Sequence, residues 1–236
     1  MPMKFTLITQ AGFILLSIVC MGLVYWALGK AAAPEGDAFR KKVQGRFLIG
    51  ILAWMGMLSL LSLSGFLNNF ELPPPFIIVL IVPLIAIVLI VRSKAFQILL
   101  THVPDAWLVW IQSFRIVVEI FLWLLFLDNV IPIQMSFEGR NLDVLVGLTA
   151  PIAALLFFRQ GNIRKMAAIL WNVFGLLLLA NIVITALLST PLPFRVFMNE
   201  PANTIIVLFP YVFLPGILVP LAYYMHVFSL RKLLRS

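Results

Sequence analysis

The sequence predicts an all-α fold, a polytopic bundle of seven transmembrane helices that forms a single domain over residues 1–236. Composition is the first observation: 63% of the residues are hydrophobic and only 11% are charged, whereas a soluble domain has roughly a quarter charged residues. The second is that the apolar residues gather into runs of roughly 20, which is the length a helix needs to cross a hydrocarbon core of about 30 Å. Helices satisfy their own backbone polar groups in lipid, so this pattern favours a helix bundle.

The apolar runs place seven spans, each with ends uncertain by several residues. The expected spans are 6–29, 46–67, 75–92, 105–128, 142–158, 166–188 and 204–229.

The connectors set the boundaries of the first three spans. The first apolar run is longer than the roughly 7–15 apolar residues of a secretory signal peptide, so it is expected to remain as a helix. Residues 30–45 are rich in Ala, Pro, Gly and charge and predict a flexible loop. The prolines at 73–75 predict a stiff turn that leads into the third span.

Caps and prolines shape the later spans. Asn141 is placed to cap the N-terminus of the fifth span. The seventh span contains Pro210, Pro215 and Pro220, and each proline removes a backbone donor and tends to kink a helix. The sequence therefore predicts a seventh helix that is kinked along its length.

Lys and Arg residues outside the spans predict the orientation. With seven spans, thirteen of these residues fall on one face and three, Lys4, Arg140 and Arg195, on the other. Positive residues are enriched in cytoplasmic loops, so the N-terminus is expected outside and the C-terminus in the cytoplasm. The net charge of +8 then reflects loops beside anionic lipid headgroups. No connector pairs its basic residues with stacking aromatic residues, so nucleic acid is not expected as a partner.

The fourth span carries the most informative polar residues, Gln112, Arg115 and Glu119. At about 100° per residue these three share one face, and Asp105 joins the same arc. Arg115 lies roughly 16 Å from the start of the span, too deep to reach the headgroups. We expect Arg115 and Glu119 to pair as i and i+4 neighbours and to face protein or a watery cavity.

Two interpretations of this polar stripe remain open. It can line a path for a substrate, ion or proton, or it can be a self-neutralised pair that fixes helix packing. If the kinked seventh helix keeps its phase, Tyr211 and His226 share a face that can line the same path.

A second polar group lies on the predicted outer face. The loops before the fifth and seventh spans make that face acidic and rich in amides, which suits a cation or a polar ligand; ordinary solvated loops and helix caps explain the same residues. The candidate outer residues are Glu138, Arg140, Asn141, Asp143, Asn199 and Glu200.

The sequence contains few residues that could bind a known cofactor or act in catalysis. The seventh span has no lysine for a retinal Schiff base, because the nearest, Lys232, lies beyond the span. His102 and His226, the only histidines, are both expected toward the cytoplasmic side, so a bis-histidine haem would lie at the membrane edge and is disfavoured. A single cysteine gives no cysteine metal cluster. Ser64 and His226 are expected at opposite ends of their helices, so an intramembrane serine protease is not supported. No metal site is predicted and the cofactor, if any, is not identified.

Two stretches carry a family resemblance. Residues 112–115 with Glu119, and residues 137–143 running on to Gly147, Ala150 and Pro151, resemble an uncharacterised family of bacterial seven-span inner-membrane proteins. The resemblance implies a bacterial inner membrane as the location and implies no activity.

The sequence leaves two functions open. The first is binding or translocation of a small solute, ion or proton through a polar cavity between the fourth, fifth and seventh helices. The alternative is a membrane-embedded subunit or scaffold that binds a second copy or another protein in the bilayer.

Overall fold

The computed structural model describes residues 5–159 and 162–235. Within these residues the regular secondary structure is helical except for one pair of two-residue strands, which confirms the predicted all-α class. The helices are α1 (Thr6–Ala32), α2 (Asp37–Leu63), α3 (Ile77–Arg92), α4 (Lys94–His102), α5 (Asp105–Trp110), α6 (Phe114–Leu127), α7 (Val144–Phe157), α8 (Lys165–Leu188) and α9 (Val219–Leu233).

Short segments complete the chain. The strands β1 (Phe158–Arg159) and β2 (Asn162–Ile163) pair antiparallel between α7 and α8. The segment η6 (Leu214–Leu218) is a π-helix that runs directly into α9. The 3₁₀ turns are η1 (Ala33–Glu35), η2 (Phe66–Asn68), η3 (Ile111–Ser113), η4 (Ile133–Met135) and η5 (Ile205–Val207).

Several helices are long and apolar enough to cross a membrane, which indicates a membrane protein. Among the described residues four qualify: Thr6–Glu35, Asp37–Leu63, Asp105–Leu127 and Lys165–Leu188. A fifth is formed by α3 and α4 if that pair, bent by 78°, is counted as one span. The helix α7 is apolar but shorter.

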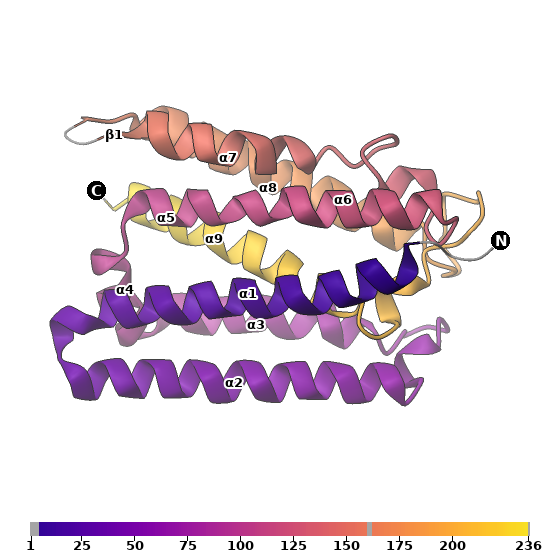
Figure 1. The fold of residues 1–236 in the computed structure, drawn as a ribbon, viewed down its shortest axis with the longest axis horizontal. Coiled ribbons are helices and arrows are strands. Elements are labelled where there is room, and N and C mark those ends of the chain that lie inside the picture. The colour runs from indigo at the N-terminus through magenta and orange to yellow at the C-terminus, as the bar shows by residue number, and fades with distance from the viewer. Residues whose placement is uncertain (1–4, 160–161, 236) are drawn as a thin grey trace.

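The outer surface of the bundle is apolar. Most helices run roughly along the long axis of the molecule, with α2 on one side and α7 on the other (Figure 1). Leu7, Ile49 and Leu60 are between 71% and 79% exposed, and similar side chains cover much of the surface. Soluble monomers rarely expose apolar patches larger than a few hundred Å², so this surface suits lipid better than water.

The first connector differs from its prediction. Residues 30–45 are not a flexible loop, because α1 continues to Ala32 and α2 already begins at Asp37. The chain reverses over η1 and Gly36, whose φ of 97° is a left-handed conformation that favours glycine. No proline stands between Asp37 and the apolar run, and the single Gly45 there costs only about 1 kcal/mol, so the basic residues extend α2.

The seventh span also differs from its prediction. Residues 204–229 do not form one kinked helix, because η5 ends at Val207 and continuous helix resumes only at Leu214. Pro210 falls within this interruption and Pro215 in the first turn of η6, and each lacks the N–H that a continuing α-helix would need. The outer third of the predicted span is therefore irregular backbone packed inside the protein.

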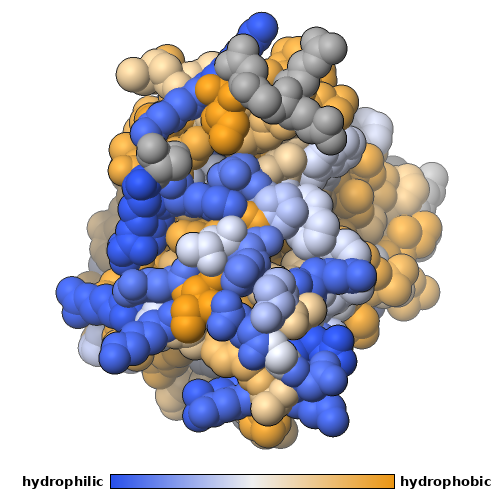
Figure 2. Space-filling model, turned by 90° about the vertical axis from the view of Figure 1, so that its left-hand side faces the viewer, coloured by the Kyte–Doolittle hydropathy of each residue, from blue (hydrophilic) through white to orange (hydrophobic). Residues whose placement is uncertain are grey.

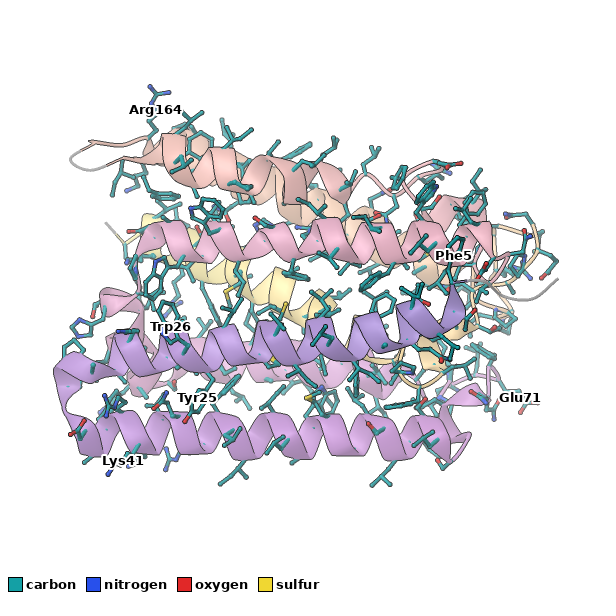
Figure 3. The ribbon with its side chains drawn as sticks, in the orientation of Figure 1. Phe5, Tyr25, Trp26, Lys41, Glu71 and Arg164 are labelled. Carbon is teal, nitrogen blue, oxygen red and sulfur yellow. The ribbon has the colours of Figure 1, made fainter. Side chains whose placement is uncertain are left out.

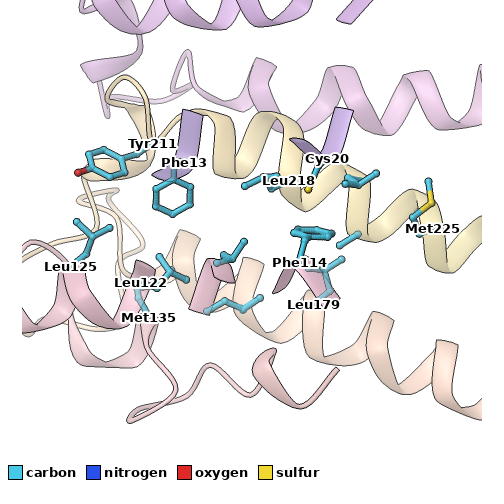
Figure 4. Packing of buried hydrophobic residues seen from close by; sticks show 14 of the residues in the cluster. Phe13, Cys20, Phe114, Leu122, Leu125, Met135, Leu179, Tyr211, Leu218 and Met225 are labelled. Carbon is cyan, nitrogen blue, oxygen red and sulfur yellow. The ribbon is translucent and has the colours of Figure 1, made fainter. Parts of the chain in front are cut away.

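A buried apolar core joins α1, α6, α8 and α9. Phe13 and Cys20 of α1 face Phe114 and Leu122 of α6, with Leu179 of α8 beside them (Figure 4). Side-chain hydrogen bonds add α2 and α3 to this core: Trp54 Nε1 donates to the Gly216 carbonyl over 2.8 Å, and the Tyr224 hydroxyl donates to the Pro83 carbonyl over 2.5 Å. The segment from η6 to α9 thus packs between the other helices.

The two ends of the bundle differ in charge. Phe5 and Glu71 lie at one end, while Lys41 and Arg164 lie at the other (Figure 3). The second end gathers hydrophilic side chains where α2 begins and α9 ends (Figure 2). At this end Trp26 and Trp107 stack at 4.9 Å between ring centroids, and Lys232 pairs with Asp105 over 3.4 Å.

Candidate functional site

Arg115 is the centre of a buried polar cluster, which we call the Arg115 cluster: Arg115, Glu119, Asn141, Asp143, Asn172 and His226. Arg115 is the second residue of α6, and its side chain is 2% exposed. Its Nε donates to Asp143 Oδ2 over 2.6 Å, and its Nη2 donates to Asp143 Oδ1, so the ion pair has two points of contact. The predicted i and i+4 pairing of Arg115 with Glu119 is therefore wrong, because Asp143 takes both of these donors.

The close approach of α7 to α6 explains why Asp143 reaches Arg115. Gly147 lies one turn after Asp143, and a Cβ placed on it would meet the Ile116 backbone nitrogen at 2.9 Å. Only glycine allows helices this near without displacing one of them. Asn141 does not occupy the predicted N-cap of α7, which is Asp143; instead its Oδ1 accepts from the Asp143 N–H over 3.1 Å.

His226 links Arg115 to α8. Arg115 Nη1 donates to His226 Nε2 over 3.0 Å, and since an arginine can only donate, the other ring nitrogen carries the proton. That nitrogen, Nδ1, donates to Asn172 Oδ1 over 2.9 Å, and Asn172 Nδ2 donates to Ser229 Oγ over 3.0 Å. Gly175 leaves room for the imidazole, because a Cβ there would lie 2.5 Å from His226 Nε2.

Glu119 is the member of the Arg115 cluster with the fewest partners. It is 2% exposed, and its two carboxylate oxygens accept from the same donor, Asn141 Nδ2, over 2.8 and 2.7 Å. The described residues give Glu119 no ion pair, whereas Asp143 is paired with Arg115. The Arg115 cluster thus contains two carboxyl groups and one guanidinium.

Gln112 and Tyr211, both predicted to line a path with Arg115, lie elsewhere. Gln112 Nε2 donates to the Ala222 carbonyl over 3.0 Å, and its buried Oε1 has no hydrogen-bond partner in the described part of the chain. Tyr211 lies in the irregular segment before η6, where its hydroxyl shares a 3.1 Å hydrogen bond with Thr9 Oγ1. His226 is the one residue of the predicted seventh-helix face that joins Arg115.

The predicted outer cluster divides in two. Asn141 and Asp143 turn inward and belong to the Arg115 cluster. The other four stay near the surface at the far end. There Glu138 accepts from Trp123 Nε1 over 2.5 Å, the Arg140 guanidinium lies 5.3 Å from the Phe197 ring centroid, and Asn199 donates to Gln134 Oε1 over 2.8 Å.

Glu200, the last of the four, holds its loop together. Arg195 Nη1 donates to Glu200 Oε1 over 2.9 Å, and the Ala202 N–H donates to Oε2 over 2.7 Å. The hydrogen bond from Arg195, followed by that from the Ala202 backbone, lowers the pKa of Glu200 below its ordinary value of 4.5.

A cavity of about 80 Å³ adjoins the Arg115 cluster. A single water needs roughly 10–15 Å³ measured in this way, so the cavity has room for several waters or a small ligand group. Arg115, Glu119, Asn141 and Asp143 form its polar part. The rest of the wall is apolar and includes Phe114, Leu122, Met135, Leu179 and Leu218, seen together in Figure 4.

A smaller cavity of about 10 Å³ lies next to the first and shares Leu122, Met135 and Leu214 with it. Asn203 and Tyr211 supply its polar groups. Asn203 Oδ1 is buried without a hydrogen-bond partner among the described residues, so a single water bound here could donate a hydrogen bond to it.

Sequence reasoning missed three features of this site. Asn172, an amide inside the apolar run of α8, bridges to Ser229 of α9 and orients His226. Gly147 and Gly175 create the space that the Arg115 cluster needs, and a glycine inside an apolar span is the signal that could have marked both positions. Within residues 5–159 and 162–235, no group of three or more His, Cys, Asp or Glu residues could hold a metal ion.

Comparison with known proteins gives one family. Residues 72–234 match the family model described as Domain of unknown function (DUF8737). The matched region starts before α3 and includes every member of the Arg115 cluster and every residue that lines the larger cavity; of the smaller cavity it includes all but Phe13. No curated protein and no solved structure matches the chain.

Proposed function

Since the chain belongs to the family described as Domain of unknown function (DUF8737), we propose its function from its own geometry: it is a membrane-embedded protein that binds or translocates a small solute, ion or proton through the cavity beside the Arg115 cluster. The single observation that carries this proposal is Glu119, a buried carboxyl group that lines the cavity and has no ion pair within the described part of the chain.

The cost of burying Glu119 supports a functional role. A carboxyl group within a membrane costs free energy unless it is paired or faces water, and ionisable residues at such depths commonly belong to ion or proton pathways. Arg115 and Asp143 neutralise each other, so they account for their own burial. Glu119 is left as the group that can take up a proton or attract a cation from the cavity.

The proposal places seven spans in a bacterial inner membrane, with the N-terminus outside and the C-terminus in the cytoplasm. The short helices α3 and α7 and the segment from η6 to α9 would join the four long helices as spans. Two features support this arrangement: most helices follow one axis (Figure 1), and Lys41 and Arg164 lie at the end that gathers hydrophilic side chains, which would face the cytoplasm (Figures 2 and 3).

Flux across liposomes tests the proposal. Purified protein is reconstituted, a potassium diffusion potential is imposed, and entry of protons is followed with an internal pH dye. We expect flux above that of protein-free liposomes for the wild type, and loss of this excess for Glu119→Gln, which keeps an acceptor for Asn141 but removes the charge.

Glu138→Gln is the matched control, because Glu138 is an exposed carboxyl group outside the cavity. It should leave the flux unchanged. The same comparison is repeated with sodium or potassium gradients and the corresponding ion dyes. Equal fluxes of all tested ions through wild type and Glu119→Gln would overturn the proposed role of the cavity in translocation.

A further inference from the structure

The partly exposed residues in the wall of the cavity beside the Arg115 cluster indicate an opening at the side of the bundle. Its walls include Leu80 of α3 and Val183 and Leu187 of α8, and all three side chains are only partly buried. Among the described residues, α3 and α8 do not pack extensively against each other; each packs instead on the segment from η6 to α9. The opening therefore faces the direction in which a membrane protein meets lipid.

Hydrogen bonds of the Arg115 cluster close the cavity toward the end of the bundle that carries Lys41 and Arg164. Arg115, His226 and Asn172 form a continuous hydrogen-bonded chain from α6 through α9 to α8. Gln112 adds a further bond from η3 to the Ala222 carbonyl. A ligand that reaches Glu119 without breaking this chain must come from the lateral opening or from the outer end.

The chemistry inside the cavity selects a cation with an apolar body. Arg115 already donates from Nε and Nη2 to Asp143 and from Nη1 to His226, so few of its N–H groups remain to bind an anionic group. Glu119 carries spare acceptor capacity, because one amide serves both of its oxygens. Around these groups the wall is almost entirely aliphatic and aromatic, which suits hydrocarbon.

From the lateral opening, the apolar wall and Glu119, which forms no ion pair with any residue that the structure describes, we propose that the cavity binds an amphiphilic amine. The ammonium group lies against Glu119, and the alkyl chain leaves between α3 and α8 toward the bilayer. The volume of about 80 Å³ accommodates an ammonium group and a few methylenes, with the remaining chain along the opening. This assignment rests on the proposed function and adds to it the class of ligand and its route of entry.

Octylammonium and octanol are the probes that isolate the charge. Equilibrium dialysis measures each radiolabelled compound on protein in lipid nanodiscs, with empty nanodiscs subtracted. We expect wild type to bind octylammonium at least tenfold more tightly than Glu119→Gln does, while octanol binds both proteins equally. Glu138→Gln should bind octylammonium like the wild type.

A second pair of variants tests the route. Val183 lines the opening, whereas its neighbour Ile184 is 55% exposed and does not line the cavity. We expect Val183→Trp to weaken octylammonium binding at least threefold and Ile184→Trp to leave it unchanged. Equal effects of the two tryptophans would overturn the lateral route.

The outcomes separate this inference from the proposed function. If Glu119→Gln abolishes proton or ion flux but leaves octylammonium binding as in the wild type, the amine assignment is overturned and the proposed function stands. If octanol binds wild type as tightly as octylammonium does, the assignment of a cation is overturned as well. If Glu119→Gln keeps both the flux and the octylammonium binding of the wild type, the proposed function and the amine assignment are both overturned.

Discussion

Arg115 donates to both carboxylate oxygens of Asp143, and this two-point ion pair joins the start of α6 to the residue that precedes α7. The two residues are 28 positions apart in sequence and both are buried. Their pairing leaves Glu119, one helical turn from Arg115, without an ion pair among the described residues. The cavity wall therefore holds two carboxyl groups and one guanidinium, and the guanidinium is in contact with only one of the two.

Replacing Arg115 tests the energetic importance of this pair. Arg115→Gln leaves two buried carboxyl groups without a cation, and removal of one partner from a buried pair costs about 3–5 kcal/mol. Arg115→Lys keeps the charge but loses the two-point geometry, so a smaller loss is expected. The exposed Arg140→Gln, by contrast, should change the free energy of unfolding by less than about 1 kcal/mol.

The single cysteine provides the measurement. Cys20 is 1% exposed, so a thiol-reactive fluorescent dye reports its exposure as the protein unfolds on heating. The midpoint temperatures should rank Arg140→Gln, then Arg115→Lys, then Arg115→Gln from highest to lowest. Equal midpoints for Arg115→Gln and Arg140→Gln would contradict a stabilising role for the pair.

Gly175 should be sensitive to the addition of one methyl group. A Cβ at this position would lie 2.5 Å from His226 Nε2, so Gly175→Ala must displace the imidazole or α8 and should cost about 1–3 kcal/mol. Gly50→Ala is the matched control, because a Cβ at Gly50 meets nothing within 4 Å. That variant should be neutral or slightly stabilising, since alanine favours a helix.

A double-mutant cycle assigns the cost of Gly175→Ala to the imidazole. In a His226→Ala background the ring is absent, so adding Gly175→Ala should have little further effect on the thermal midpoint. If Gly175→Ala costs the same in both backgrounds, the methyl group meets something other than His226.

The apolar runs predicted most of the helices well. Residues 166–188 were expected as a span and α8 runs over Lys165–Leu188, while the fourth span differs from Asp105–Leu127 by one residue. Such long runs leave few alternatives to a helix. The start of α2 was missed because the basic residues after Asp37 give no apolar signal, although nothing in them opposes a helix.

The site was predicted only in part, for a physical reason. Spacing along one helix suggested Glu119 as the partner of Arg115, whereas the observed partner, Asp143, depends on how closely α7 approaches α6. That approach is a tertiary property set by Gly147 and by the inward turn at Asn141. Tyr211 was misplaced because the proline-rich segment before η6 does not keep helical phase.

Glu200 gives the outer loop a dependence on pH. Its pKa is lowered by the hydrogen bonds from Arg195 and Ala202, so its contribution to loop stability is fully present above the ordinary value of 4.5. The contribution is lost as the pH falls below 4.5 through the lowered pKa. Hydrogen exchange at the Ala202 amide, corrected for the intrinsic pH dependence of exchange, should therefore show reduced protection below this pH.

Glu200→Gln provides the comparison, because its side chain cannot titrate. Protection of the Ala202 amide in this variant should be lower than in the wild type at neutral pH and should not change further as the pH falls. A wild-type amide whose corrected protection is constant from neutral pH to well below 4.5 would contradict the assigned role of Glu200.

Cysteine labelling tests the number and direction of the spans. In a Cys20→Ser background, Glu71→Cys and Glu138→Cys should react in intact bacterial cells with a maleimide that cannot cross the membrane. Lys41→Cys and Arg164→Cys should react only after the inner membrane is permeabilised. Glu71 lies at the opposite end of the bundle from Lys41 and Arg164 (Figure 3).

The pair Glu138 and Arg164 is the most informative, because α7, with only 14 residues, lies between them. A straight helix of this length covers about 21 Å, less than the roughly 30 Å of hydrocarbon. The segment before it, in which Asn141 and Asp143 are buried, would have to supply the remaining depth, and backbone of this kind is tolerated at membrane depth only inside protein. Reaction of both cysteines from the same side would show that α7 does not cross, and the seven-span arrangement would then be wrong.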